Sequence, residues 1–454
     1  MSNTKLMPKE NKMGVMPIPR LLFSMALPMM ASMLVQALYN IVDSVFVSRI
    51  SEEAFTSVSL AFPMQNLMIG AGAGIGVGMN ALLSKKLGEK DYDTANKVAM
   101  QGVFLAFCGA LIFALLGLTV IRNYMMGQSN NPEIVEGGVI YLRIVCIMSI
   151  GLFGQLIMER MLQSTGLTVY SMITQMTGAL INMVLDPILI FGLLGAPKMG
   201  VAGAAVATIF GQITAACLAV YLNITKNKEI NLKLSNIKPN PKLIGQILMV
   251  GVPSMLMIAI GSIMTFGMNK ILGTFSSTAQ AVFGAYYKLQ SFIMMPVFGL
   301  NNGMIPILAY NYGARRKGRI MQTIKLSIIT AVVIMLGGLL LLQLAPGPLL
   351  RFFNASEHLL SIGIPALRII SISYVFAGFC IVASSIFQAF GNGIFSMIVS
   401  ALRQLVVLLP AAYLFSLSGN LNMVWWAYPL AELVSLVACL FFLLRIYRQI
   451  ISKL

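Results

Sequence analysis

The sequence predicts an all-α membrane protein. Its twelve transmembrane helices form two parallel six-helix bundles, related by a pseudo-twofold axis along the membrane normal. Three observations support this prediction. The 454-residue chain is 58% hydrophobic and only 10% charged, with a mean hydropathy of +0.86. Long apolar runs recur along the chain, and the second half repeats landmarks of the first.

Apolar content on this scale exceeds what a soluble core can bury, which excludes an ordinary globular domain. About 20 apolar residues at a helical rise of 1.5 Å cross a hydrocarbon layer of roughly 30 Å. Twelve runs meet this length, and we expect helices at 20–48, 57–83, 95–121, 138–161, 168–192, 201–224, 243–272, 279–308, 320–345, 359–387, 393–417 and 421–447.

The internal repeat emerges when the chain is aligned with itself at an offset of 225 residues. The matched positions are residues that interrupt or end helices: Pro28/Pro253, Gly78/Gly303, Gly88/Gly313, Gln163/Gln388 and Gly166/Gly391. We therefore expect an amino-terminal six-helix lobe at 1–224 and a carboxy-terminal lobe at 243–454. Residues 225–242, rich in lysine and ending in Lys-Pro-Asn-Pro-Lys, are the expected cytoplasmic linker.

The net charge of +17 follows alternate loops, which argues against a nucleic-acid-binding surface. Basic residues gather in the first segment, in the second, sixth and eighth loops and in the tail. Examples are Lys5, Lys9, Lys12, Lys85, Lys86, Lys226, Lys228, Arg315, Arg316, Arg445 and Lys453. By the positive-inside rule both termini are cytoplasmic, in a multi-pass protein of the plasma membrane. Six crossings per copy make the two copies parallel.

Three acids fall inside apolar runs of the first copy, namely Asp43, Glu159 and Asp186. The positions 225 residues later hold Met268, Ser384 and Ala411, so only the first copy has this ionisable centre. A carboxylate in the membrane costs several kcal/mol unless it is paired, hydrated or protonated. Three of them would repel one another unless some bind protons or cations. We therefore expect this centre to be loaded and unloaded by a transmembrane ion gradient.

Polar residues accompany these acids at helical spacing, and we expect the resulting stripes to line one wet pocket. The stripes are Gln36, Tyr39, Asn40 and Asp43; Gln155 and Glu159; Asn182 and Asp186; and Thr208 and Gln212. The alternative is that the amides serve only as hydrogen bonds between helices. Pro187 frees a backbone carbonyl near Asp186 that a cation or water could use, and Pro28 marks a bend or a static kink.

In the second copy, Tyr286, Lys288 and Gln290 form an amphipathic patch suited to ligand contact, and Arg403 could add positive charge nearby. The alternative for both cations is snorkelling toward an interface. Glu432 in the last helix could pair with a nearby cation. The glycines between Gly70 and Gly78 sit in a membrane helix without a following Lys-Ser/Thr, so they indicate close packing rather than a phosphate loop.

The sequence contains no nucleotide motif, catalytic triad or metal-spaced Cys/His cluster, so we expect no enzyme activity, no metal and no cofactor. The doubled plan, Leu-Pro-Met-Met at 27–30, Tyr-Asn-Ile-Val-Asp at 39–43, Glu159 and Asn-Met-Val-Leu-Asp-Pro-Ile-Leu-Ile-Phe-Gly at 182–192 resemble the multidrug and toxic compound extrusion (MATE) family. The fourth-helix glutamate resembles its bacterial DinF-like or MepA-like branch.

The resemblance implies two lobes around a cleft that opens alternately to either side, with inward H+ or Na+ driving export of cationic, lipophilic compounds. It implies a cation site at Tyr39, Asp43, Asn182, Asp186 and Thr208, with Glu159 nearby and a helix bend at Pro28. Some branches carry further acids in helices seven and ten, whereas this chain has none there, which counts against a second cation site.

The expected function is therefore secondary active efflux by a monomer, with H+ or Na+ as the coupling ion. Its partners would be small cationic or lipophilic substrates and the lipid bilayer. The substrate contacts would come from Gln36, Asn40, Gln155, Tyr286, Lys288 and Gln290. The alternative is a flippase for lipids or lipid-linked oligosaccharides, which should hold several cations in its cleft for pyrophosphate.

Overall fold

The computed structural model describes residues 10–233, 237–352 and 356–454. The first copy forms α1 (Lys12–Val15), α2 (Ile18–Ser48), α3 (Glu52–Gly88), α4 (Tyr92–Thr119), α5 (Ile121–Met126), α6 (Pro132–Ile147), α7 (Ile150–Ser164), α8 (Thr168–Phe191) and α9 (Val201–Thr225). The second forms α10 (Pro241–Gly273), α11 (Ser277–Gly313), α12 (Lys317–Leu344), α13 (Pro346–Arg351), α14 (Glu357–Ser371), α15 (Tyr374–Ala389), α16 (Gly393–Ala401), a π-helical segment (Leu402–Leu408), α17 (Leu409–Ser416), α18 (Leu421–Trp425) and α19 (Ala427–Gln449).

The helix boundaries repeat at the 225-residue offset, because the same capping chemistry recurs in both copies. Ser51 and Ser276 cap α3 and α11, each accepting a backbone N–H three residues ahead at 3.0 and 3.1 Å. The turns after α7 and α15 use Gly166 and Gly391 at φ +84° and +82°, a region open to glycine. Local sequence signals thus produce the duplication seen in the fold.

The expected membrane spans are confirmed, with two of them broken. Among the described residues ten helices are long and apolar enough to cross a membrane. Two more spans are bent pairs: α6 with α7 at 48°, and α14 with α15 at 53°. The sequence predicted a single span at 138–161 and another at 359–387. The breaks fall at equivalent places in the two copies, so they belong to the repeated unit.

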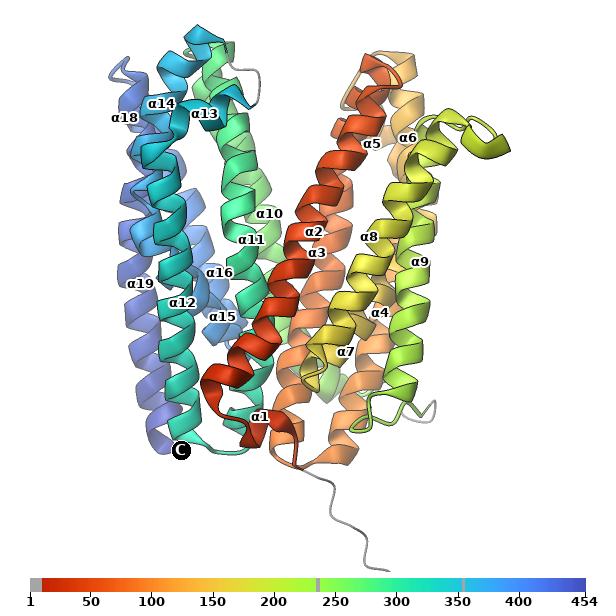
Figure 1. The fold of residues 1–454 in the computed structure, drawn as a ribbon, viewed down its shortest axis with the longest axis vertical. Helices are drawn as coiled ribbons and strands as arrows, with labels where there is room; N and C mark the ends of the chain where they lie inside the picture. The colour runs from red at the N-terminus through yellow and green to blue at the C-terminus, as the bar shows by residue number, and fades with distance from the viewer. Residues whose placement is uncertain (1–9, 234–236, 353–355) are drawn as a thin grey trace, which may run out of the picture.

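The two copies form two bundles that lie close together at one end and diverge toward the other (Figure 1). The described start of the chain and the carboxy terminus both lie at the close end, which we call the terminal face. Contacts between the bundles are reciprocal: α2 packs against α11, and α3 packs against α10. The pairing follows from the twofold axis, since α10 is the second-copy equivalent of α2, and α11 that of α3.

Glycines allow this reciprocal contact. A Cβ atom on Gly88 would overlap the Tyr310 carbonyl oxygen, and one on Gly313 would overlap that of Lys85. Both pairs are related by the 225-residue offset, since Lys85 corresponds to Tyr310. The same holds deeper in the bundles, where α3 meets α10 at Gly78. The glycines of the 70–78 run contact α7 and α10, which confirms that they serve helix packing.

Candidate functional site

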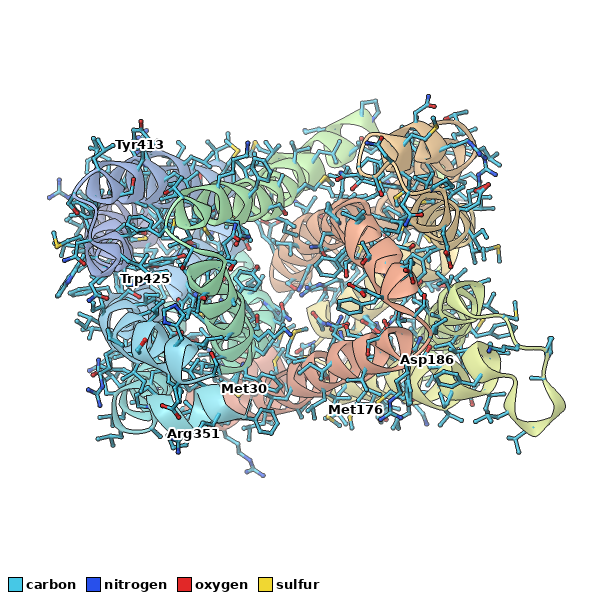
Figure 2. The ribbon with its side chains drawn as sticks, turned by 90° about the horizontal axis from the view of Figure 1, so that it is seen from above. Met30, Met176, Asp186, Arg351, Tyr413 and Trp425 are labelled. Carbon is cyan, nitrogen blue, oxygen red and sulfur yellow. The ribbon has the colours of Figure 1, made fainter. Side chains whose placement is uncertain are left out.

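Asp186 on α8 is fully buried in the amino-terminal bundle, and Asp43 on α2 faces it. Figure 2 labels Asp186 where α2 and α8 lie side by side. Within the described part of the chain, both carboxylate oxygens of Asp186 and Oδ1 of Asp43 have no hydrogen-bond partner. Two carboxyl groups thus meet without a donor between them, an arrangement that requires a proton or a cation for stability.

Neighbouring side chains complete this site. Asn182, one turn before Asp186, donates from Nδ2 to Thr208 Oγ1 at 3.2 Å, which leaves its own Oδ1 buried and without a donor among the described residues. Tyr39 lies next to Asp43 and Thr208. The structure therefore brings five of the six predicted coupling residues together, on α2, α8 and α9. Their shared property is a surplus of oxygen acceptors.

Glu159, the sixth predicted coupling residue, does not join this group. It is only 1% exposed, on α7. Its carboxylate accepts three hydrogen bonds: from Gln155 Nε2 at 2.9 Å, Thr174 Oγ1 at 3.1 Å and Gln175 Nε2 at 2.9 Å. Gln175 is eleven residues before Asp186 on α8, about 17 Å along the helix axis at 1.5 Å per residue. The expectation of one pocket holding all three acids is therefore wrong.

The different depths explain this correction. The chain enters α2 and α8 at the terminal face, so Asp43 and Asp186 lie toward their far ends. It runs through α7 in the opposite direction, which places Glu159 near the terminal face. Helical spacing predicted the neighbour Gln155 correctly, but that side chain is committed to Glu159 rather than exposed for a substrate. The bundle thus contains two buried acidic sites, one fully hydrogen-bonded and one lacking donors.

Arg160, next to Glu159, was missed by the sequence reasoning. Its Nη1 donates to Gln163 Oε1 at 2.9 Å and to Asn302 Oδ1 at 2.8 Å. Asn302 lies on α11, so this hydrogen bond joins the two bundles. Residues one position apart on a helix point about 100° apart, which lets Glu159 face inward while Arg160 faces the other bundle. The sequence did contain a signal for Arg160, because it is a charged residue directly beside a glutamate within a membrane span.

The predicted substrate contacts are dispersed. Gln36 and Asn40 are exposed on α2, and Lys288 and the partly buried Gln290 lie on α11. Tyr286 is 1% exposed and packs edge-on against Tyr428 with ring centroids 5.8 Å apart. Its expected role in ligand contact is therefore wrong for this conformation, because its side chain points into the second bundle. The helical periodicity of α11 places it opposite the exposed Lys288.

The proposed bends remain predictions. Pro28 lies inside the uninterrupted α2 and Pro187 inside the uninterrupted α8. The carboxy-terminal bundle has a different polar centre, where Arg403 Nη1 donates to Glu432 Oε1 at 2.9 Å. This contact confirms that Glu432 pairs with a cation, and it assigns Arg403 to an ion pair rather than to snorkelling or to a ligand.

Comparisons with known proteins agree with this doubled architecture. The MatE family model matches residues 28–188 and 253–414, two segments that begin 225 residues apart. The chain is 25% identical over 417 residues to the multidrug export protein MepA of Staphylococcus haemolyticus strain JCSC1435, covering 92% of this chain and 91% of that one. It is 26% identical over 425 residues to MepA of Staphylococcus aureus strain MRSA252, covering 93% of both.

Solved structures show the same likeness. A multidrug resistance MATE family transporter in an outward-facing conformation superposes with a TM-score of 0.92 at 25% identity, covering 98% of this chain and 99% of that one. The MATE multidrug transporter DinF-BH gives 0.89 at 29% identity, with the same coverage. Both matched segments and the full-length fold lead to one conclusion: this chain belongs to the MATE family and is a transporter of the MepA and DinF type, not an enzyme.

Proposed function

We propose that this protein exports cationic, lipophilic compounds across the plasma membrane in exchange for protons. The names of its relatives, multidrug export proteins, support the substrate class. The observation that supports the proton as coupling ion is a set of buried oxygens on Asp43, Asp186 and Asn182 that have no hydrogen-bond donor among the described residues. Protons bound by the carboxyl groups supply the missing donors. Na+ is the second candidate, because oxygen ligands also suit a hard cation.

Alternating access would follow from the reciprocal packing of the two bundles. The terminal face carries the basic loops, so we place it in the cytoplasm. The conformation described here is then closed toward the cytoplasm and diverges toward the outside. A ligand shifts such an equilibrium only through its different affinity for the two states. Antiport therefore requires that the coupling ion and the exported compound each favour a different state.

In this proposal Glu159 is a second buried acidic site, which lies nearer the cytoplasmic side than Asp43 and Asp186. Its three neutral donors already satisfy the carboxylate. In contrast to Asp186, it needs no ion to complete its hydrogen bonds. Replacing Glu159 with Gln should therefore weaken efflux less than the corresponding replacement of Asp186.

The decisive experiment measures ethidium efflux from vesicles under an imposed proton gradient. Asp43→Asn and Asp186→Asn should each reduce efflux to the level measured without a gradient, while the protein still inserts in the membrane. Glu136→Gln, which removes an exposed acid of the same bundle, is the matched control and should leave efflux unchanged. Unchanged efflux in either aspartate variant contradicts the assignment. Repeating the assay with a Na+ gradient alone distinguishes the two ions.

The flippase alternative required several cations in the central space. The structure commits Arg403 to Glu432, which removes one of the two side chains that favoured that alternative. Vesicle assays with a labelled lipid-linked sugar test it directly. Movement of that lipid without ethidium efflux would replace the present proposal.

A further inference from the structure

A pocket of about 420 Å³ opens on the terminal face where the two bundles meet. Its walls come from the end of α3, the end of α11 and the last residues of the chain. The lining residues are Lys85, Glu89, Tyr312, Gly313, Arg315, Gln449, Ile450, Lys453 and Leu454. None of these residues belongs to the buried acidic sites, and the proposed transport cycle does not use the pocket.

The pocket is cationic. Lys85, Arg315 and Lys453 reach it from three separate segments, and Lys85 Nζ lies 4.7 Å from the centre of the Tyr312 ring. The lining acid, Glu89, pairs with Lys86 at 2.7 Å and also lies 3.9 Å from the ammonium group of Lys85. The three cations outnumber the one acidic side chain in the lining, so the pocket keeps an excess of positive charge that would stabilise a bound anion.

The wall formed by the tail is held in place. Lys317 Nζ donates to the Ser452 carbonyl oxygen at 3.3 Å, and the same ammonium group lies 5.9 Å from the centre of the Tyr447 ring. Ile451 is only 1% exposed, so it anchors the segment between the lining residues. The pocket is therefore formed by packed side chains at the ends of three membrane helices rather than by a loose surface loop.

A pseudo-symmetric counterpart lies across the twofold axis. At the 225-residue offset, Lys85 corresponds to Tyr310 and Leu454 to Glu229. At this second place the segment around α1 covers the surface. A Cβ on Gly14 would lie 3.2 Å from the Tyr310 ring, and Asn11 Nδ2 donates to Glu229 Oε1 at 2.5 Å.

The covering segment also brings an anion. The Glu10 carboxylate accepts a hydrogen bond from Arg316 Nη2 at 2.5 Å. Arg319 donates to the carbonyl oxygens of Met13 and Met16 at 2.9 and 2.8 Å. One side of the axis is thus covered by the chain's own carboxylate-bearing segment, while the equivalent place on the other side is an open cationic pocket.

We propose that the open pocket binds the phosphate headgroup of an anionic phospholipid. The pocket lies at the ends of membrane helices, the depth at which lysine, arginine and tyrosine side chains meet lipid headgroups. Each basic residue near an anionic membrane surface adds about 1 kcal/mol. The bound headgroup would contact both bundles and so favour the state that is closed at this face. This proposal rests on the proposed function in one respect: the lipid is assigned to the cytoplasmic leaflet because the terminal face was placed in the cytoplasm.

Native mass spectrometry of protein released from nanodiscs tests the proposal. The nanodiscs contain phosphatidylcholine with or without phosphatidylglycerol. The wild-type protein should retain phosphatidylglycerol selectively. Retention should fall about fivefold for each cation removed, in Lys85→Gln, in Arg315→Gln and in the double variant, because about 1 kcal/mol corresponds to that factor.

The matched control is the double variant Lys90→Gln/Lys242→Gln. It removes the same charge from the same face, and Lys90 shares with Arg315 a left-handed backbone, at φ 59° and 55°. Retention in this control should equal that of the wild type. Equal retention in the Lys85/Arg315 double variant overturns the proposal. So does complete displacement of the lipid by inorganic phosphate, which would show a site for a soluble anion. Neither result depends on transport, so a failed efflux assay leaves this test valid.

Discussion

The two bundles share one fold but treat buried charge in opposite ways. In the amino-terminal bundle, Asp43 and Asp186 face each other without a donor among the described residues. In the carboxy-terminal bundle, Glu432 has its own cation, Arg403. A carboxylate with a fixed cation needs no ion from solution, whereas a pair of carboxylates does. Duplication therefore preserved the frame, while among the described residues only the first copy has a pair of facing carboxyl groups without a fixed cation.

The strongest test of the shared frame replaces glycines at the reciprocal contact. Gly88→Ala and Gly313→Ala would each press a Cβ against a backbone carbonyl of the other bundle. Because neither backbone can yield easily, we expect each to destabilise the described conformation by about 3 kcal/mol. Thermal unfolding in detergent measures the effect, together with cysteine accessibility at the terminal face.

Two other glycines provide the control. Gly245 and Gly284 have open space where a Cβ would lie, so Gly245→Ala and Gly284→Ala should not destabilise the protein. The twofold axis further requires that Gly88→Ala and Gly313→Ala have similar effects. A large effect at one and none at the other would show that the two contacts are not equivalent.

The contrast between the bundles is sharpened by removing one charge from each. Arg403→Gln leaves Glu432 unpaired, and we expect a loss of about 2 kcal/mol, below the range for a fully buried pair because Arg403 remains partly exposed. Adding Glu432→Gln should restore most of that loss. Asp186→Asn, in contrast, should not lower the melting temperature, because no side chain in the described part of the protein pairs with the Asp186 carboxylate.

Melting temperatures of the three purified variants decide this comparison. If the Arg403/Glu432 double variant is as unstable as Arg403→Gln, the pair is not the source of the effect. A large destabilisation by Asp186→Asn would show that the aspartate is satisfied by contacts other than an exchangeable ion.

The smallest expected effect concerns the terminal face of the first bundle, where Glu229 occupies the place of Leu454 in the second. Burial raises the pKa of Glu229, while the hydrogen bond from Asn11 opposes the shift. Its contribution to stability is therefore complete below the usual glutamate pKa of about 4.3 and is lost as the pH rises through the raised value.

Glu229→Gln keeps an acceptor for Asn11 and removes this titration. From acidic to neutral pH, the melting temperature of the wild type should fall relative to that of the variant. Glu10, Tyr92 and Tyr310 are titratable groups nearby, and all three remain in the variant. If the melting temperatures of the two proteins change with pH in parallel, ionisation of Glu229 is not coupled to unfolding in this pH range.

The sequence was sufficient to predict the repeat, the twelve spans and the polar neighbour Gln155 one turn before Glu159. These features depend on local periodicity and on the residues that end helices. The breaks after Ile147 and Ser371 could not be predicted, because both lie inside continuous apolar runs. The hydrogen bond from Arg160 to Asn302 joins residues 142 positions apart, so only the packing of the bundles reveals it.

The depth of Glu159 was predictable in principle. Alternate spans run in opposite directions, so an acid near the end of the fourth span lies at the opposite face from acids near the ends of the first and fifth. The helical stripes indicate the face of each helix that carries polar residues, and the order of crossing indicates the depth of each residue. Direction and periodicity together are sufficient to separate Glu159 from Asp186 on the amino-acid sequence alone.

The reciprocal contact of α2 with α11 and of α3 with α10 has the geometry of an isologous interface in a homodimer. Each unit offers the same patch and receives the same patch in return. Such an association closes on itself at two units, in contrast to a head-to-tail association, which can continue into filaments. Fusing two copies into one chain therefore consumes both complementary patches and leaves neither available for recruiting a third unit.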